Sequence, residues 1–265
     1  MKIITYIFAV CVLFSCENST GVKEQPSSVP EHAELKENDP VPGKEPQTSG
    51  LKTELRILLP ATYREWEGKY PVDHLTKDWV ELYRKNGRYY LEKADYKIEK
   101  GSDECSGSDT KTIITKRNAV LLMNLPDPEL GEIGAVKMRM SKIWPNEKTS
   151  FQFNGTTYYL RAEGEILSGE ETMDSGEDRF HDVKNYKLYI STGTTAETLF
   201  LEQEAFNDTF IELLFAGDID RDGKLDFIVS ASRHYEEHRV LLFLSSKAEA
   251  GELIKKVAEL AIQFD

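Results

Sequence analysis

Four aspartates crowd residues 217–227, which read Gly-Asp-Ile-Asp-Arg-Asp-Gly-Lys-Leu-Asp-Phe. Calcium is a hard cation that takes several oxygen ligands at once, and carboxylates at alternate positions of a tight curl turn to the same side. Gly223 lies where the chain must bend sharply, and glycine adopts a positive φ without a Cβ penalty. We therefore expect calcium to be bound here by the side chains of Asp218, Asp220, Asp222 and Asp226 and by the backbone carbonyl of Lys224. The alternative for the same residues is a solvated acidic turn.

A second stretch with metal-binding residue types is His234-Tyr235-Glu236-Glu237-His238, which fits the His-x-x-Glu-His signature of one class of zinc proteases. That chemistry needs a helix, so that both histidines share a face and hold one zinc ion while Glu237 activates the bound water. The stretch lies between two apolar runs, each with the character of a strand. We therefore expect a strand here, with Tyr235 inward and His234 and Glu236 toward solvent. A cell-envelope zinc-dependent hydrolase using His234, Glu237 and His238 is the alternative function.

Residues 1–15 predict a lipoprotein signal peptide. Lys2 supplies a positive start, and the apolar run that follows is shorter than the ~20 residues that a membrane-spanning helix needs. The run ends in Leu13-Phe14-Ser15-Cys16, which resembles the bacterial lipobox. The resemblance implies cleavage before Cys16, a diacylglyceryl thioether on its sulfur and an acylated amino end, which together anchor the protein stably to a membrane. The alternative is an ordinary secreted protein with a chance cysteine.

Residues 16–50 predict the lipidated cysteine and a disordered tether behind it. Segment 17–50 holds five of the ten prolines, no aromatic residue, and seven acidic against three basic residues. Such a composition cannot bury enough apolar surface to offset the entropy of ordering. Glu17, and not aspartate, follows the cysteine. By resemblance to the sorting rule of many Gram-negative lipoproteins, this favours the outer membrane.

The charge balance limits the classes of possible partner, and the cysteine count limits the possible disulfides. Removal of residues 1–15 takes away one lysine and leaves 32 basic against 46 acidic residues. This balance argues against nucleic acid as a partner. Cys105 is then the one thiol besides the acylated Cys16, so no internal disulfide can form.

Residues 51–265 predict one mainly β domain with an antiparallel sandwich, barrel or propeller-like arrangement and one or two short helices. Short apolar or alternating runs recur with turns between them, and Asn86-Gly87 and Asn154-Gly155 each predict a tight hairpin. The expected strands are 55–59, 79–83, 89–98, 113–114, 119–123, 135–143, 151–162, 186–191, 210–215, 227–230, 240–244 and 253–260. Helices are expected around 62–69 and 71–85.

The aspartate loop resembles two known patterns. In an EF-hand a glutamate would stand at Val229, which here lies in an apolar run, so a helix–loop–helix site is excluded. The loop is more similar to the Asp-x-Asp-x-Asp-Gly-x-x-Asp loop of FG-GAP (integrin α-like) repeats, where a strand precedes and follows it. That resemblance implies the ligand set given above and an ion that holds the hairpin together. The motif occurs once, so a propeller of identical blades is not expected.

The end of the chain, 217–229 and 234–246, is also similar to that of uncharacterised lipoproteins of Bacteroidetes-type bacteria, a resemblance that implies no known activity. The sequence thus predicts a calcium-binding lipoprotein of the cell envelope, acting as a non-enzymatic binding or scaffolding module. Its partners are the membrane, through the lipid anchor, and an envelope protein or glycan that the sequence does not name.

Overall fold

The computed structural model describes residues 54–65, 68–103, 106–168 and 182–263. The predicted signal peptide, Cys16, the tether and Cys105 lie outside the described residues. Residues Lys52–Asp265 form one compact unit, and all that follows concerns this unit.

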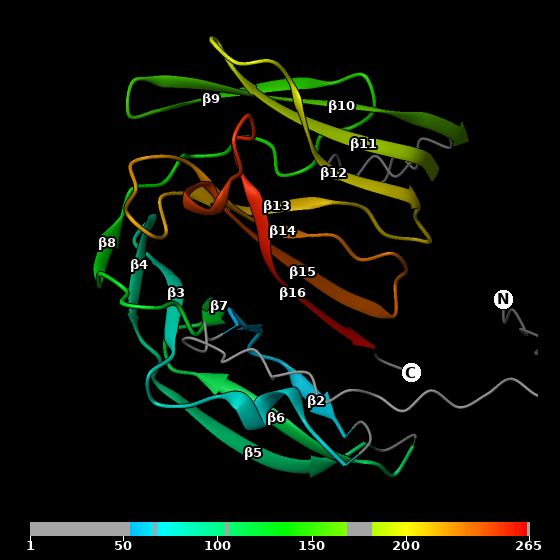
Figure 1. Cartoon of the computed structure of the whole chain (residues 1–265). Helices are drawn as coiled ribbons and strands as arrows, with labels where there is room; N and C mark the ends of the chain where they lie inside the picture. Colours follow the sequence, from blue (N-terminus) through cyan, green and yellow to red (C-terminus); the bar gives the residue numbers. More distant parts are fainter. Residues whose placement is uncertain (1–53, 66–67, 104–105, 169–181, 264–265) are drawn as a thin grey trace, which may run out of the picture. The chain divides into compact units, whose positions relative to one another are not determined.

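The unit consists of four antiparallel sheets, and no α-helix occurs among the described residues (Figure 1). The mainly β prediction is confirmed, and the sheets stack face to face without closing into a barrel. Two single-turn 3-10 helices, η1 (Pro71–His74) and η2 (Ser245–Lys247), are the helical elements of the described chain.

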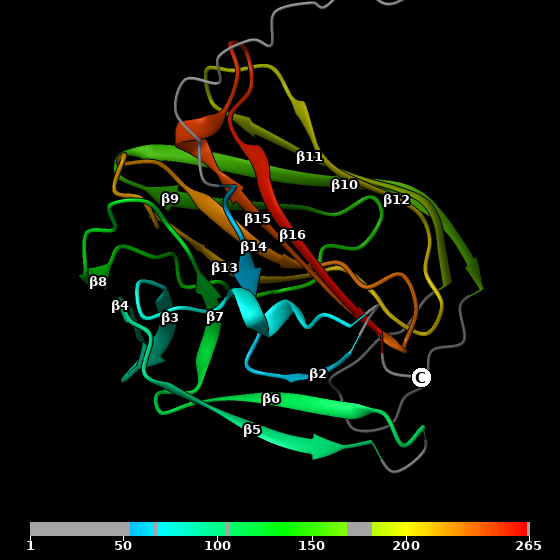
Figure 2. The ribbon, with the colours of Figure 1, turned by 60° about the horizontal axis from the view of Figure 1, so that its bottom comes forward.

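The four sheets are named here by their place in the stack. The strands of the first outer sheet, in spatial order, are β1 (Ile57–Leu58), β7 (Ala119–Met123), β3 (Val80–Lys85), β4 (Arg88–Lys93) and β8 (Gly131–Ile133). Those of the second outer sheet are β12 (Thr198–Ala205), β11 (Asp182–Thr192), β10 (Thr156–Ser168) and β9 (Lys148–Phe153). Those of the central sheet are β13 (Glu212–Gly217), β14 (Asp226–Ser230), β15 (Glu237–Leu244) and β16 (Lys255–Gln263). A small sheet holds β2 (Thr62–Arg64), β6 (Asp109–Thr115) and β5 (Tyr96–Ser102), and Figure 2 shows it below the stack.

The central sheet is covered on both faces. Successive side chains of a strand point to opposite faces, and those of the central strands enter two different hydrophobic cores. Along β15, Leu242 and Leu244 pack toward the first outer sheet, whereas Leu241 and Phe243 pack toward the second. Burial on both faces explains why β14 and β15 contain continuous apolar runs, while β11 and the edge strand β16 alternate between buried and exposed side chains.

Both predicted Asn-Gly hairpins are confirmed. Asn86 and Gly87 join β3 to β4, and Asn154 and Gly155 join β9 to β10. All four residues have positive φ, as a two-residue turn of this type requires.

Three expectations about local structure were wrong. No α-helix forms among the described residues of 62–69 or 71–85, where the chain instead places β2, the single-turn 3-10 helix η1 and β3. The apolar residues of β3 are buried between β4 and β7, so tertiary pairing overrides local preference. The expected strand 135–143 is mostly irregular, because it meets the edge strand β13 only near its two ends.

That irregular segment nevertheless covers the edge of β13. Val136 N–H donates to Ala216 O at 2.9 Å, and Leu213 N–H donates to Ser141 O at 2.7 Å. The contact is closest at Gly217, where an added Cβ would lie 2.5 Å from Gly134 O and 2.9 Å from Ala135 Cα. Only glycine fits between these two stretches of backbone.

We predict that Gly217→Ala lowers the free energy of unfolding by about 1–3 kcal/mol, because the new methyl group must push backbone aside. Chemical denaturation of the variant beside wild type measures this loss. Gly193→Ala is the matched control, since no atom lies within 4 Å of its Cβ position. Equal stability of Gly217→Ala and wild type would contradict the close approach.

Candidate metal centre

The aspartate loop joins β13 to β14 at one end of the central sheet. Its curl is made by Arg221 and Gly223, whose φ angles are +60° and +84°. The positive φ expected at Gly223 is thus confirmed. Asp222 Oδ1 accepts a hydrogen bond from the N–H of Lys224 at 2.9 Å, and Asp218 Oδ2 accepts one from Gly223 N–H at 3.1 Å.

Three of the predicted ligands come together. One oxygen from each of Asp218, Asp220 and Asp222 lies within 4.8 Å of the other two, and this is the one such group of potential metal ligands among the described residues. Oδ1 of Asp218 and Oδ1 of Asp220 are buried and have no hydrogen-bond partner among the described residues. Buried polar atoms are nearly always paired, so two orphaned oxygens in one cluster need an explanation.

Asp226 takes a different position from the other three. Its side chain is fully buried and accepts hydrogen bonds from Ile219 N–H at 2.7 Å and Ser245 N–H at 2.8 Å. Burial raises its pKa to about 7, with a further increase from the carboxylate of Asp220, although the hydrogen bonds act the other way. Asp226 therefore lies on the buried side of the loop, and both of its carboxylate oxygens already accept hydrogen bonds from backbone amides.

Two further carboxylates of the described chain are just as deeply buried, and both have a cationic partner. Glu81 is bound by Arg117, and Glu237 is bound by Arg233. Asp226 accepts hydrogen bonds from amides and a hydroxyl and makes no ion pair with any residue that the structure describes. The aspartate loop is thus the place in the described structure where buried carboxylates lack a positive charge.

Asp218, like Asp226, is a carboxylate whose surroundings disfavour its negative charge. Its pKa is raised, first by burial and then by the carboxylates of Asp222 and Asp220, against the lowering effect of the Gly223 amide. A raised pKa means that the ionised form is disfavoured in the folded protein. A cation between the three carboxylates would reverse this preference.

Lys224 contacts the loop through its backbone N–H, which donates to Asp222 Oδ1, and its ammonium lies 4.0 Å from Asp222 Oδ2. The use of its carbonyl as a ligand stays a prediction.

Two serines complete the site and were not predicted. Ser245 Oγ lies 2.9 Å from Asp222 Oδ2 and 3.0 Å from Asp226 Oδ1, and Ser246 Oγ donates to Asp220 Oδ2. Both serines stand in η2, directly after β15, which pairs with β14. The feature of the sequence that could have indicated their role is the pair Ser245-Ser246, directly after the apolar run 240–244.

The loop also contacts both outer sheets. Arg221 donates from Nη2 to Glu132 O at 3.0 Å and from Nε to Glu129 O at 3.2 Å, in and beside β8. Asn154, in the β9–β10 turn, donates from Nδ2 to Gly223 O at 3.0 Å. One loop therefore connects the ends of all three stacked sheets.

The histidine motif does not form the helix that zinc hydrolysis requires. His234 lies in the turn before β15, whereas Glu237 and His238 begin that strand. Glu237 is buried, and its carboxylate accepts hydrogen bonds from the backbone and side chain of Arg233. The expected inward position of Tyr235 was wrong, because 60% of this residue is exposed.

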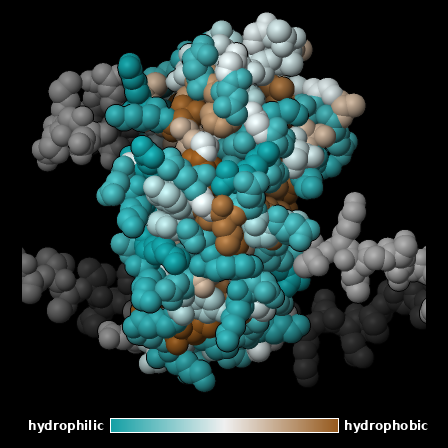
Figure 3. All heavy atoms as spheres, turned by 90° about the vertical axis from the view of Figure 1, so that its left-hand side faces the viewer, coloured by the Kyte–Doolittle hydropathy of each residue, from teal (hydrophilic) through white to brown (hydrophobic). Residues whose placement is uncertain are grey.

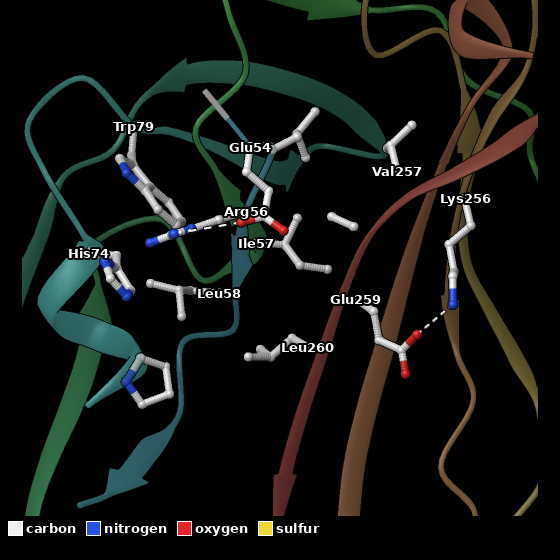
Figure 4. Close-up of a pocket in the computed structure, with 13 residues that line it drawn as sticks. Glu54, Arg56, Ile57, Leu58, His74, Trp79, Lys256, Val257, Glu259 and Leu260 are labelled. Atoms are coloured by element: carbon white, nitrogen blue, oxygen red, sulfur yellow. Dashed lines mark hydrogen bonds and ion pairs between the residues drawn. The ribbon is translucent and has the colours of Figure 1, made fainter. Parts of the chain in front are cut away.

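A hollow of about 460 Å³ lies between β1 and β16, with Trp79 and His74 on one side and Val257 and Leu260 on the other (Figure 4). The acids at its rim are already paired with bases. Glu54 pairs with Arg56 at 3.6 Å, and Glu259 pairs with Arg239 at 2.7 Å and with Lys256 at 2.6 Å. None of its lining residues belongs to the aspartate loop, and the hollow offers no comparable ligand set.

Comparisons with protein-family models, with curated proteins and with solved structures found no match. The resemblances to FG-GAP loops and to bacterial lipoproteins therefore stay predictions. No helix of the described residues is long and apolar enough to cross a membrane.

We predict that, in chelator, the stability advantage of wild type over Asp226→Asn shrinks as pH rises from about 4 to about 7. The folded protein holds this proton up to a pKa of about 7, whereas the unfolded chain releases it near the ordinary value of 3.8. Between these values the unfolded state binds fewer protons, so stability falls as pH rises. Thermal melts of both proteins across this range measure the difference, and a difference that does not change with pH would contradict the raised pKa.

Proposed function

We propose that this chain is a cell-envelope lipoprotein whose β domain binds a structural calcium ion in the aspartate loop and acts as a non-enzymatic binding or scaffolding module. The observation that carries the calcium proposal is the cluster of Asp218, Asp220 and Asp222, with two buried carboxylate oxygens that have no partner. A divalent cation is the simplest partner for such oxygens.

The donor set favours calcium over softer metals. All three gathered ligands are carboxylates, and no histidine or cysteine belongs to the group. Hard oxygen ligands suit calcium and magnesium, whereas zinc sites draw on histidine and cysteine. In this proposal the carbonyl of Lys224 and the carboxylate of Asp226 would complete the shell after a small rearrangement.

The contacts of the loop support a structural role for the ion. Arg221 holds the segment that leads into β8, and the carbonyl of Gly223 holds the β9–β10 turn. An ion that fixes the curl would fix both contacts. We therefore propose that calcium stabilises the stack of sheets and takes no part in catalysis.

The envelope part of the proposal rests on the sequence. The lipobox ending at Cys16 supports a lipid anchor, and Glu17 supports the outer membrane. The partner of the module is proposed to be another envelope component, a protein or a glycan.

We predict that calcium raises the melting temperature of wild type and has a much smaller effect on Asp220→Asn. An ion that binds only the native state adds about 2.7 kcal/mol when its concentration is about 100-fold above Kd. The substitution keeps the size of the side chain and removes the charge on one ligand. Thermal melts in calcium, in zinc and in chelator, together with a metal-content assay, make the comparison.

The matched control is Asp127→Asn, which removes one acid from an exposed turn elsewhere in the domain. It should respond to calcium as wild type does. A calcium response that is equal in Asp220→Asn and wild type would contradict the assignment. Stoichiometric zinc, lost on replacement of His234 or His238, would support the hydrolase instead.

We predict that Cys16→Ala releases the protein from membranes, because the acyl chains have no other attachment site in the lipobox. Cys11→Ala, which alters a cysteine inside the predicted signal peptide, is the control and should leave anchoring unchanged. Fractionation of cells that express each variant measures the outcome. Membrane retention of Cys16→Ala would overturn the lipid anchor.

A further inference from the structure

A groove on the face that carries β4 and β8 has a composition unlike the rest of the chain. It has a volume of about 700 Å³, within the range of ligand pockets, and lies between the β3–β4 turn and the irregular segment 134–141. Figure 3 shows this face, on which apolar residues surface in small patches among hydrophilic ones.

The groove is basic, although the protein is acidic. The complete chain has 33 basic and 46 acidic residues, whereas the lining holds four bases, Arg84, Arg88, Lys137 and Arg139, and one acid, Glu132. Glu132 is already paired with Arg88 at 3.0 Å. Arg84, Lys137 and Arg139 make no ion pair with any residue that the structure describes. Three uncompensated positive charges therefore surround one hollow, and they favour an anionic ligand.

Apolar side chains lie between these charges. Val136, Met138 and Leu214 line the groove and are partly exposed. Methionine is flexible and polarisable, and it is common on surfaces that adapt to peptide ligands. The lining therefore suits a ligand that carries apolar groups as well as negative charge.

The backbone of the lining can also bind a ligand. Val136 and Ser141 are joined to β13 by hydrogen bonds, but between them the segment makes no backbone hydrogen bond with the described residues. Free N–H and C=O groups of this segment can pair with the backbone of a bound peptide.

The groove offers little to a sugar ring. The one aromatic residue of the lining is Tyr89. Its ring packs edge-on with Phe215 at 4.9 Å between centroids, and the guanidinium of Arg84 lies 5.7 Å from its centroid. Since its neighbours already use the ring, stacking of a glycan is disfavoured relative to peptide binding.

We propose that this groove binds an extended acidic segment of a partner protein, with alternating acidic and apolar residues. The acidic side chains meet Arg84, Lys137 and Arg139, and the apolar ones contact Val136 and Met138. The inference rests on the proposed role as a binding module and deepens it by naming the class of partner. It does not depend on the calcium site.

The test uses the full chain in calcium and a fluorescein-labelled peptide of alternating glutamate and valine. We expect saturable binding by fluorescence anisotropy that weakens with added salt. Lys137→Glu combined with Arg139→Glu should weaken it roughly tenfold or more, because two charges facing an acidic ligand are reversed. Replacing valine by serine in the peptide should weaken binding as well.

The matched control is Lys77→Glu combined with Lys100→Glu, which makes the same change of net charge at exposed positions outside the groove. It should bind the peptide as wild type does. Equal loss in both double variants, or no loss in either, would overturn the groove as the site. Tighter binding of polygalacturonate than of the peptide would overturn the choice of a protein partner. Melting temperatures and calcium content of the same samples show separately whether the calcium proposal holds.

Discussion

Burial of the central sheet on both faces is the constraint on which the rest of this structure depends. The strands β13, β14 and β15 each supply side chains to two cores, so the middle positions of β14 and β15 are apolar. Polar side chains in β14 and β15 are therefore confined to the ends of the strands. The aspartate loop and η2 lie at one such end, where carboxylates can approach each other with part of their surface still in contact with water.

The same constraint explains the unusual state of the loop carboxylates. Asp226 begins β14 and is buried with the rest of that strand, and burial without a cation raises its pKa. Elsewhere in the described chain, arginine balances a buried carboxylate, as Arg117 does for Glu81. A loop that instead gathers further carboxylates around the buried one concentrates negative charge that a bound cation would balance.

Local signals in the sequence predicted local structure well. Apolar runs in the sequence predicted the strands of the central sheet, and the two Asn-Gly pairs predicted the β3–β4 and β9–β10 hairpins of the outer sheets. The spacing of Asp218, Asp220 and Asp222 predicted that their side chains turn to one side. The sequence could not show contacts between distant segments. The contribution of Ser245 depends on which strand lies beside β14, and that of Arg221 depends on where β8 ends. The alternation in 135–143 is present, but a strand also needs a partner along its length, which periodicity does not reveal.

The order of the sheets along the chain has a consequence for folding. β13–β16 follow all the other strands in sequence, yet they form the middle of the stack. During synthesis, the two outer sheets therefore emerge before the layer against which their apolar faces are buried. Neither face can be covered until the final strands are available, and the exposed surfaces are then prone to association with other chains. The arrival of the last strands would close both cores together, which makes assembly of this domain a late and concerted event.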